Sequence, residues 1–422
     1  MLYGWERLSQ QEEDLITCGI MDGESYGGPF HLALFPTDRC NLNCFFCYTA
    51  SLRQVAKELD WPTLERALQD GVKAGVKGVS FGGGGEALMY KELPRIFDFI
   101  EEHALTVDSL KTNATTLSEE TARRLIAAQL RSITISLNET EPAEYAKMGQ
   151  CTPQLFERAM QGLSHIVQAK KAADAACQIS VQVFVWKGNR HRLIEMVEML
   201  LETGTDLVYL NTIDQLPPEQ HMDDAERAEL KETIRELLKR WADQLELNFS
   251  AEGLQQFAAE EQYKHYPQAI ELPEMCRTPE RIEYCYMPWY AAVIAANGDV
   301  YPCCHFATDE GRSLGNLHRQ ALPEIWTGKA AQECRREMRQ LLLANGDPGL
   351  LPGKTRFIHP LCQGRTSCAF NFYLSAPTFY HRVHDWAESG PRQRWQRQAQ
   401  LKQKVANLWR KSKNLCKKVV GR

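Results

Sequence analysis

Three cysteines in one short stretch are the residues whose type and spacing most clearly indicate chemistry. Cys40, Cys44 and Cys47 follow the pattern Cys-x3-Cys-x2-Cys. Thiolates this close along a chain can converge on a soft metal centre, either zinc or an iron-sulfur cluster. A closed site needs a fourth ligand, and neither Cys18 nor Cys151 has a paired spacing that would supply one. A cube of four irons held here would keep one iron open, and an open coordination position is where a metal centre does chemistry.

Six short apolar runs typical of β-strands must position this stretch. They alternate with segments whose apolar residues recur at three- and four-residue spacing, as in amphipathic helices. The runs are 31–35, 78–81, 109–112, 132–136, 179–185 and 207–211. The helical segments include 63–74, 93–103, 118–128, 154–170 and 193–202. Strand followed by helix, repeated in this way, predicts a parallel sheet that binds its ligands at the carboxyl ends of its strands.

A glycine run follows the second apolar run, just as the cysteines follow the first. It consists of Gly82, Gly83, Gly84 and Gly85 and leads into Glu86. Without a Cβ, backbone amides and carbonyls can approach a ligand closely. A glycine cluster alone is more often a simple turn. Its place at the end of a strand, next to the cysteine loop, makes it a candidate site.

The cysteine spacing and the glycine run together resemble the radical SAM superfamily. In that family three cysteines hold a [4Fe-4S] cluster, and S-adenosylmethionine chelates the fourth iron. The resemblance gives this role to the three cysteines and places Tyr48, the aromatic residue that follows them, near the adenine. Gly84-Gly85-Glu86-Ala87 resembles the Gly-Gly-Glu-Pro motif that binds the methionine moiety, with Ala87 in place of proline. The alternative without the resemblance is a zinc site completed by a distant ligand, or ordinary buried thiols.

Two further strand ends carry the same resemblance. Thr112-Asn113-Ala114 is similar to the family's Thr-Asn-Gly, and Ser136 and Asn138 stand where polar side chains reach the ribose. Ser136 and Asn138 could instead cap a short helix at 142–147. The resemblance covers about residues 30–215 and implies a partial (β/α)6 barrel of the TIM type, left open, in an α/β fold.

A second group of cysteines begins at Cys285. An Asn297-Gly298 turn between two apolar runs predicts a β-hairpin that brings Cys285 and Cys303 together. A helical segment at 330–343 follows, and then a Cys-x5-Cys pair, Cys362 and Cys368. Four thiols in this layout could close a second cluster, or they could bind zinc.

This layout resembles the C-terminal SPASM domain of radical SAM maturases and dehydrogenases, a small α+β cysteine-rich domain. Its signature continues with cysteines where this chain has His359 and Phe372. The resemblance therefore implies one auxiliary [4Fe-4S] cluster in place of the usual two. Its ligands would be Cys285, Cys303, Cys362 and Cys368. Cys304 competes with Cys303, and His359 is an alternative ligand because histidine serves in some iron-sulfur sites.

Composition limits the class of protein. The chain has 422 residues, 44% of them hydrophobic and 24% charged, which is typical of a globular protein of two or three domains. It has no secretory signal and no apolar run of the ~20 residues that a membrane helix needs. Fourteen cysteines without an export signal favour reduced thiols in the cytoplasm. The expected division is 1–29 lead-in, 30–215 radical SAM barrel, 216–272 linker with a helix over 219–247, 273–375 SPASM-like domain and 376–422 basic helical tail.

The tail is strongly basic. Residues 391–422 contain eleven Lys or Arg and no acidic residue. Leu401, Val405, Leu408 and Trp409 fall on one helical face, and a basic amphipathic helix of this kind can bind an anionic partner or a membrane surface. The commoner role, which we favour, is a solvated helix packed on its own domain.

The resemblance implies an enzyme. A flavodoxin- or ferredoxin-like donor would reduce the cluster, and S-adenosylmethionine would be cleaved to a 5'-deoxyadenosyl radical that abstracts hydrogen from a substrate. We expect oxidative modification of a peptide or protein, since that is the commonest use of SPASM domains. The alternatives are radical oxidation or epimerisation of a carbohydrate or other small molecule and, in another class, a non-catalytic iron-sulfur redox or sensing protein. For an acid or base, His31, Glu86, Tyr209 and Asp214 lie near strand ends, and nothing in the sequence ranks them.

Overall fold

The structure is a computed structural model of the 422-residue chain. It describes residues 5–47, 49–213, 221–248, 285–307, 312–345, 347–351, 355–358 and 378–398. Tyr48, Cys362, Cys368, His359 and the tail beyond residue 398 lie outside the described residues. Within the described ranges, no helix combines the length and the apolar character needed to cross a membrane.

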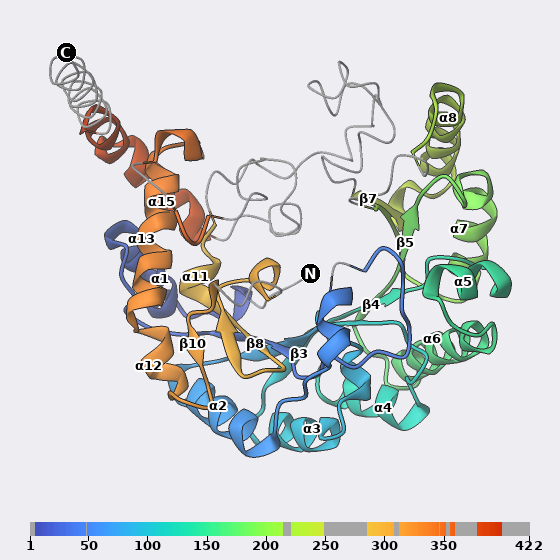
Figure 1. Ribbon diagram of the computed structural model, residues 1–422, viewed down its shortest axis with the longest axis horizontal. Helices are drawn as coiled ribbons and strands as arrows, with labels where there is room; N and C mark the ends of the chain where they lie inside the picture. The colour runs from blue at the N-terminus through green and yellow to red at the C-terminus, as the bar shows by residue number, and fades with distance from the viewer. Residues whose placement is uncertain are drawn as a thin grey trace, which may run out of the picture.

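Among the described residues, a ten-stranded sheet forms the centre of the molecule, in the order β10-β9-β8-β1-β2-β3-β4-β5-β6-β7. Strands β1 to β7 are parallel neighbours in chain order. The sheet curves into an arc that stays open between its two end strands, with helices outside it (Figure 1). This arrangement confirms the predicted partial barrel. The parallel strands are β1 (His31–Phe35), β2 (Gly78–Phe81), β3 (Thr106–Thr112), β4 (Ser132–Ser136), β5 (Gln178–Val185), β6 (Leu207–Thr212) and β7 (Leu245–Asn248).

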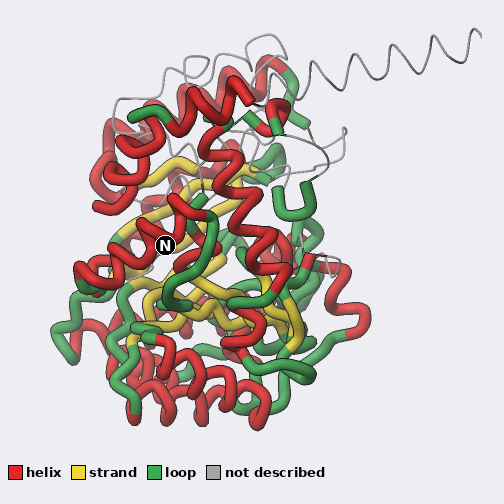
Figure 2. Tube along the Cα trace, turned by 90° about the vertical axis from the view of Figure 1, so that its left-hand side faces the viewer, coloured by secondary structure: helices red, strands yellow, loops and turns green. Residues whose placement is uncertain are grey.

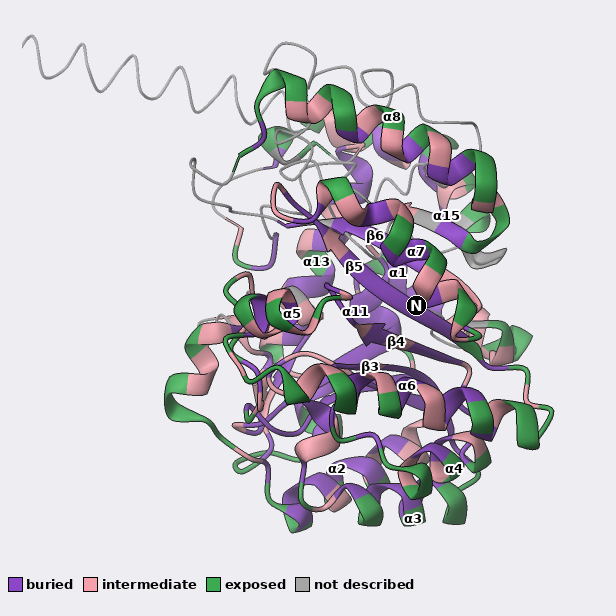
Figure 3. Ribbon diagram, turned by 90° about the vertical axis from the view of Figure 1, so that its right-hand side faces the viewer, coloured by how far each residue is buried: buried purple, intermediate pink, exposed green. Residues whose placement is uncertain are grey.

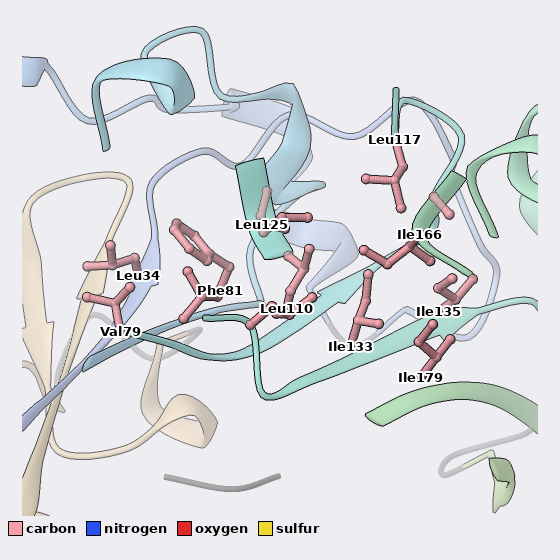
Figure 4. Packing of buried hydrophobic residues seen from close by; sticks show 14 of the residues in the cluster. Leu34, Val79, Phe81, Leu110, Leu117, Leu125, Ile133, Ile135, Ile166 and Ile179 are labelled. Atoms are coloured by element: carbon pink, nitrogen blue, oxygen red, sulfur yellow. The ribbon is translucent and has the colours of Figure 1, made fainter. Parts of the chain in front are cut away.

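Helices cover the convex face of this sheet. Leu34, Phe81, Leu110 and Ile133 point from the strands towards helix residues such as Leu125, and all are buried in one core (Figure 4). The strands are mostly buried, and the helices expose mainly their outer surfaces (Figure 3). The covering helices are α2 (Trp61–Ala74), α3 (Leu93–Glu102), α4 (Glu119–Ala127), α5 (Pro142–Gly149), α6 (Gln154–Ala172), α7 (Leu193–Glu202) and α8 (Asp224–Trp241).

Local signals explain where these helices begin and end. The Asp60 side chain accepts from the Thr63 N–H at 3.0 Å and so begins α2, and Gly75 ends it in a left-handed conformation, with φ at 100°. Ser118 caps α4 in the same way as Asp60 caps α2. The short apolar runs and their capped helices therefore form the predicted units to within a few residues.

The C-terminal part of the chain joins the barrel sheet directly. Strand β8 (Ala291–Ala295) pairs in parallel with β1 over five residues, and β9 (Asp299–Tyr301) and β10 (Gly315–Asn316) extend the sheet antiparallel. The predicted hairpin is confirmed, with Gly298 at φ 80° in its turn. Because β8 occupies the edge of β1, that apolar strand has hydrogen-bonded neighbours on both sides.

The N-terminal lead-in packs against the C-terminal helices. Ile16 and Ile20 share a buried cluster with Trp289 and Leu342, and the Trp289 indole donates to the Glu24 carbonyl oxygen at 2.6 Å. Figure 2 shows these helices outside the strands on that side of the molecule. The helices are α1 (Gln10–Asp22), α11 (Met287–Tyr290), α12 (Leu322–Trp326), α13 (Lys329–Leu343) and α15 (Thr378–Glu388).

The predicted C-terminal end of one helix is wrong. The sequence predicts a helix over 219–247, but α8 ends at Trp241, and Leu245–Asn248 form strand β7, which pairs in parallel with β6. The Leu-Glu-Leu-Asn alternation has the period of a strand, and the charged helix before it hid this signal. The five-part division of the chain stays a prediction.

Candidate functional site

The three cysteines lie on the loop that leaves the carboxyl end of β1. All three are partly buried, and the Cys47 N–H donates to the Cys44 carbonyl oxygen at 3.1 Å. The Arg53 guanidinium donates to Cys47 Sγ at 3.0 Å from the short helix η2 (Ala50–Val55). Asn113 Nδ2 lies 3.9 Å from Cys40 Sγ. The Cys40 thiol thus lies beside the residue that follows β3, and the Cys47 thiol beside η2.

Burial keeps the thiols of Cys40 and Cys44 protonated in the absence of a cation. It raises the pKa of Cys44 to about 12, and the neighbouring thiols of Cys40 and Cys47 raise it further. The pKa of Cys40 is raised as well, again chiefly by burial. Each sulfur therefore lies within the electrostatic range of the others. Metal binding here would have to displace protons, and the charge of the metal would supply the driving force.

The donor set suits an iron-sulfur cluster. As they stand, the described side chains include no group of three or more His, Cys, Asp and Glu that would hold a single metal ion. In a cube of four irons each thiolate binds a different iron, so its ligands need not meet at one point. Three soft thiols with no fourth ligand beside them on the loop fit that group.

The glycine run is joined to the cysteine loop through the backbone. The Gly85 N–H donates to the Thr37 carbonyl oxygen at 2.9 Å, the Glu86 N–H to that of Arg39 at 2.7 Å, and the Thr49 hydroxyl to that of Gly84 at 2.7 Å. A Cβ on Gly85 would lie 2.0 Å from the Arg39 carbonyl oxygen. Glycine is required because the two loops touch backbone to backbone.

Two of the other glycines are also required. Gly83 and Gly84 have φ values of 69° and 62°, and a Cβ on Gly83 would lie 2.1 Å from the ring of Phe35. The replacement of proline by Ala87 does not loosen the turn, because the buried Glu86 side chain holds it: its carboxylate accepts from the Leu88 N–H at 3.2 Å.

Glu86 also connects the second and third strand ends. Its carboxylate accepts from the Thr112 hydroxyl at 2.6 Å and from the Asn113 N–H at 2.8 Å. Burial raises the pKa of Glu86, although these hydrogen bonds oppose the rise. Asn113 in turn donates to Asn41 Oδ1 at 3.0 Å, which connects it to the cysteine loop. Glu86 and Asn113 therefore connect the cysteine loop, the glycine run and the loop after β3.

Ser136 and Asn138 lie at and just beyond the end of β4. Asn138 is buried, and its Oδ1 accepts from the Phe184 N–H at 3.1 Å. The alternative that these residues cap the helix at 142–147 is wrong: the N-cap of α5 is Glu141, and no side chain caps that end. Ser136 is half-buried and remains available to a ligand at the edge of the sheet.

An aromatic group that sequence reasoning missed borders the cysteine loop. Phe46 packs against Phe184 with ring centroids 4.8 Å apart, and Phe45 packs against Trp186 at 5.4 Å. These ring pairs are tilted, with 56° and 59° between their planes, and a flat ring such as a nucleobase can pack on one face of such a group. The signal was present in the sequence, since Phe45 and Phe46 lie between Cys44 and Cys47, but the strand partners follow only from the fold.

His31 lies at the other end of the barrel. It is the first residue of β1; its Nδ1 lies 3.1 Å from Asp108 Oδ2 and its Nε2 2.9 Å from Ser80 Oγ. Asp108 also accepts from Arg7 at 2.5 Å. Burial acts to raise the pKa of Asp108, but the hydrogen bond with His31 and the charges of His31 and Arg7 hold it below its usual value. His31 is therefore part of a buried network away from the cysteine loop. Asp214, another candidate, lies outside the described residues, and Tyr209 is buried in β6.

The described auxiliary cysteines lie near one buried cluster. Cys285 precedes α11 and Cys303 follows β9, and both pack against the cluster that contains Trp289 and Tyr290. Cys304 packs there too, and both Cys303 and Cys304 also contact a second cluster lined by Phe35 and Phe306. The choice between Cys303 and Cys304 as a ligand stays a prediction, as do the ligand roles of Cys362 and Cys368.

The fold and site define an open parallel α/β barrel with three thiols, a glycine run and an aromatic wall at its carboxyl edge. Comparison with known families agrees. Residues 34–200 match the radical SAM superfamily, and residues 285–346 match the SPASM iron-sulfur cluster-binding domain. The chain therefore belongs to the radical SAM superfamily and carries a C-terminal SPASM domain. These domains imply a [4Fe-4S] cluster that binds S-adenosylmethionine and an auxiliary iron-sulfur cluster.

Relatives span several activities. The chain is 25% identical over 318 residues to the tungsten-containing aldehyde ferredoxin oxidoreductase cofactor-modifying protein of Pyrococcus furiosus, covering 71% of this chain and 81% of that one. It is 28% identical over 170 residues to a probable GTP 3',8-cyclase of Methanosarcina mazei, covering 39% of this chain. That match spans about half of the cyclase, 48% of its length.

Solved structures share the fold. SuiB of Streptococcus suis superimposes with a TM-score of 0.55 at 19% identity, covering 77% of this chain and 72% of that one. Native anSMEcpe with bound AdoMet gives a TM-score of 0.53 at 13% identity, covering 88% of this chain and 100% of that one. At these identities the likeness concerns the fold alone.

Proposed function

We propose that this chain reductively cleaves S-adenosylmethionine to a 5'-deoxyadenosyl radical, which abstracts hydrogen from a substrate for oxidative modification of a peptide or protein. The observation that carries the proposal is the joining of the cysteine loop to the glycine run through Gly85 and Glu86. Two loops from neighbouring strands thereby form one site at the edge where parallel barrels bind ligands.

The residues of this chain have distinct tasks in the proposed reaction. Cys40, Cys44 and Cys47 would hold the catalytic cluster. The backbone of Gly83 to Glu86 would bind the methionine moiety, and Asn113, Ser136 and Asn138 would orient the ribose. Phe46, with Phe184 beside it, would pack on the adenine and exclude water from the reacting atoms. Tyr48, the residue after the third cysteine, would also lie near the adenine.

The substrate proposal rests on the SPASM domain and on a likeness to peptide-binding structures. SuiB has been solved bound to its precursor peptide SuiA, and anSMEcpe with bound peptides. Cys285, Cys303, Cys362 and Cys368 would fill every ligand position of an auxiliary cluster, which suits electron transfer, and thus net oxidation, better than substrate binding. A flavodoxin- or ferredoxin-like protein would donate the electron. We infer a cytoplasmic location, since fourteen cysteines without an export signal favour reduced thiols.

The test uses anaerobically reconstituted full-length protein. Iron, sulfide and zinc are measured per chain, followed by 5'-deoxyadenosine formation with dithionite and S-adenosylmethionine. The wild type is compared with the triple variant Cys40→Ala/Cys44→Ala/Cys47→Ala and with Cys18→Ala, an exposed cysteine, as the matched control. We expect about eight irons in the wild type and in the control, and about four without deoxyadenosine formation in the triple variant.

Other results would favour the alternatives. A full iron content without any S-adenosylmethionine cleavage would favour an iron-sulfur redox or sensing protein. About four irons together with zinc would remove the auxiliary cluster and its oxidative role. Cleavage that a carbohydrate or another small molecule stimulates, while no peptide does, would replace the peptide substrate by the small-molecule alternative.

A further inference from the structure

The concave face of strands β3 to β6 is mainly polar, with Phe184 as an apolar exception, whereas their convex face belongs to the apolar core. Leu110, Ile133, Val181 and Leu210 belong to that core, so their sequence neighbours face the barrel interior. Sheet register places these neighbours in rows: Lys111 is beside Thr134, Ser136 beside Gln182, and Phe184 beside Asn211. The interior wall consists mainly of Lys111, Thr134, Ser136, Ser180, Gln182, Tyr209 and Asn211.

Lys111 is the cation of this wall. It lies two residues before Asn113, close to the carboxyl end of β3. Protein surrounds it, yet part of its side chain remains accessible. A Cβ on Gly82, at the end of the neighbouring strand, would lie 3.7 Å from Lys111 Cβ, so the missing side chain leaves room beside the lysine stem.

Both cysteine loops lie near this lysine. The titratable groups whose charge acts on Lys111 are the thiols of Cys304 and Cys47, one from each loop. Among the described residues, no carboxylate pairs with its ammonium group. Burial lowers the pKa of Lys111 to about 8, and the two thiols oppose this shift. A buried cation without a counter-charge is costly, and an anionic ligand would relieve that cost.

Two further polar groups of the same wall have no hydrogen-bond partner among the described residues. They are Nε2 of Gln182, which is 1% exposed, and Oδ1 of Asn211, which is 8% exposed. Such groups are rare in folded proteins and call for an explanation. Gln182 lies two strands and two residues from Lys111, roughly 10 Å across the sheet and roughly 7 Å along it. A small polar group could reach both.

We propose that Lys111 binds a carboxylate of the substrate inside the barrel, between the two cysteine loops, with Gln182 donating to the same polar segment. The proposal rests on the proposed function in so far as the carboxylate belongs to the molecule that is modified. A carboxylate fits better than a phosphate because the described residues of the wall offer one cation and neutral donors, whereas phosphate sites typically combine an arginine fork or a helix N-terminus with their cations. Free carboxylates occur in peptides at acidic side chains and at the C-terminus.

The test measures the reactivity of Lys111 itself. Reconstituted full-length protein, with S-adenosylmethionine present throughout, is methylated by isotope-labelled formaldehyde and a mild borane reductant, and the labelling rate of each lysine is read by peptide mass spectrometry. N-acetylglycine is the carboxylate probe, N-acetylglycinamide is its neutral match, and inorganic phosphate is a third arm. Lys91, whose side chain is 65% exposed, is the internal control.

We expect N-acetylglycine to slow the labelling of Lys111 several-fold, the amide to leave it unchanged, and neither to affect Lys91. Lys111→Met, which keeps the apolar stem, should bind N-acetylglycine at least about tenfold more weakly in calorimetry, while Lys91→Met should bind it as the wild type does. Equal protection by acid and amide, no protection, or protection by phosphate alone would overturn the proposal.

Deoxyadenosine formation in the same samples separates this inference from the proposed function. Protection without any S-adenosylmethionine cleavage would leave the anion site in place and refute the enzymatic role. Cleavage of S-adenosylmethionine without protection of Lys111 would support the enzymatic role and refute the anion site. A loss of iron in Lys111→Met with unchanged binding of N-acetylglycine would show that the lysine supports the clusters, and would also overturn the proposal.

Discussion

Replacing Gly85 by alanine tests the contact that forms the site. The new Cβ would lie 2.0 Å from the Arg39 carbonyl oxygen and 2.5 Å from the Asp38 carbonyl carbon. Because both neighbours are backbone atoms, one of the two loops must move. This movement would weaken the hydrogen bonds that the Gly85 and Glu86 N–H groups donate to the cysteine loop. Overpacking of about 1–3 kcal/mol and the weakening of two hydrogen bonds, each worth about 1 kcal/mol, give a destabilisation of roughly 2–4 kcal/mol.

The chain provides a matched control in the same run. A Cβ on Gly82 meets only Lys111 Cβ, at an ordinary 3.7 Å, and Gly82 has no positive φ. At about 2–4 °C per kcal/mol, we expect Gly85→Ala to lower Tm in anaerobic thermal unfolding by about 4 °C or more, and Gly82→Ala by no more than about 2 °C. Gly85→Ala should also lose iron and deoxyadenosine formation. Equal Tm values for the two variants would refute the close contact between the loops.

Two further predictions concern buried carboxylates. Burial raises the pKa of Glu139 to about 7 although Arg192 donates to it at 2.7 Å, so the folded state holds this proton more tightly than the unfolded state does. Stability should therefore fall as pH rises from about 4.5 to 7, by up to about 3 kcal/mol, and this fall should be smaller in Glu139→Gln; denaturant unfolding across that range measures it, and parallel curves would contradict it. Asp108→Asn leaves the Arg7 guanidinium without its counter-charge and removes the carboxylate that pairs with His31, and it should cost roughly 3–5 kcal/mol. Because this network lies at the amino end of the strands, deoxyadenosine formation per folded molecule should persist, and a selective loss of activity would show that the network reaches the site.

Much of the barrel could be predicted from local pattern. Strands such as 132–136 and 179–185 are short apolar runs between amphipathic helices, and each signal lies within a few residues of the element that it predicts. The end of the linker was harder. Leu245–Asn248 follows a long charged helix, and only pairing with β6 shows that these residues extend the sheet.

Some features of the site could likewise be predicted from local sequence, and others follow only from the fold. The spacing of Cys40, Cys44 and Cys47 and the run before Glu86 are local features, and they pointed to the correct edge of the sheet. The partnership of Phe46 with Phe184, and the position of Lys111 near both cysteine loops, join residues far apart in sequence. No spacing rule links such residues, because the curvature and register of the sheet determine their separation.

The sequence by itself determined the class of the protein: its thiol and glycine spacings, placed after strands, carry the chemistry of the radical SAM superfamily, and its periodicity carries the parallel fold. Only the tertiary structure decided which candidates share the site. His31 and Glu86 both lie near strand ends, yet His31 is at the amino end of β1, while Glu86 clamps the loops at the carboxyl edge. The physical reason is that the local pattern of apolar residues indicates where each strand begins and ends, whereas long-range pairing and packing determine which strand ends lie together.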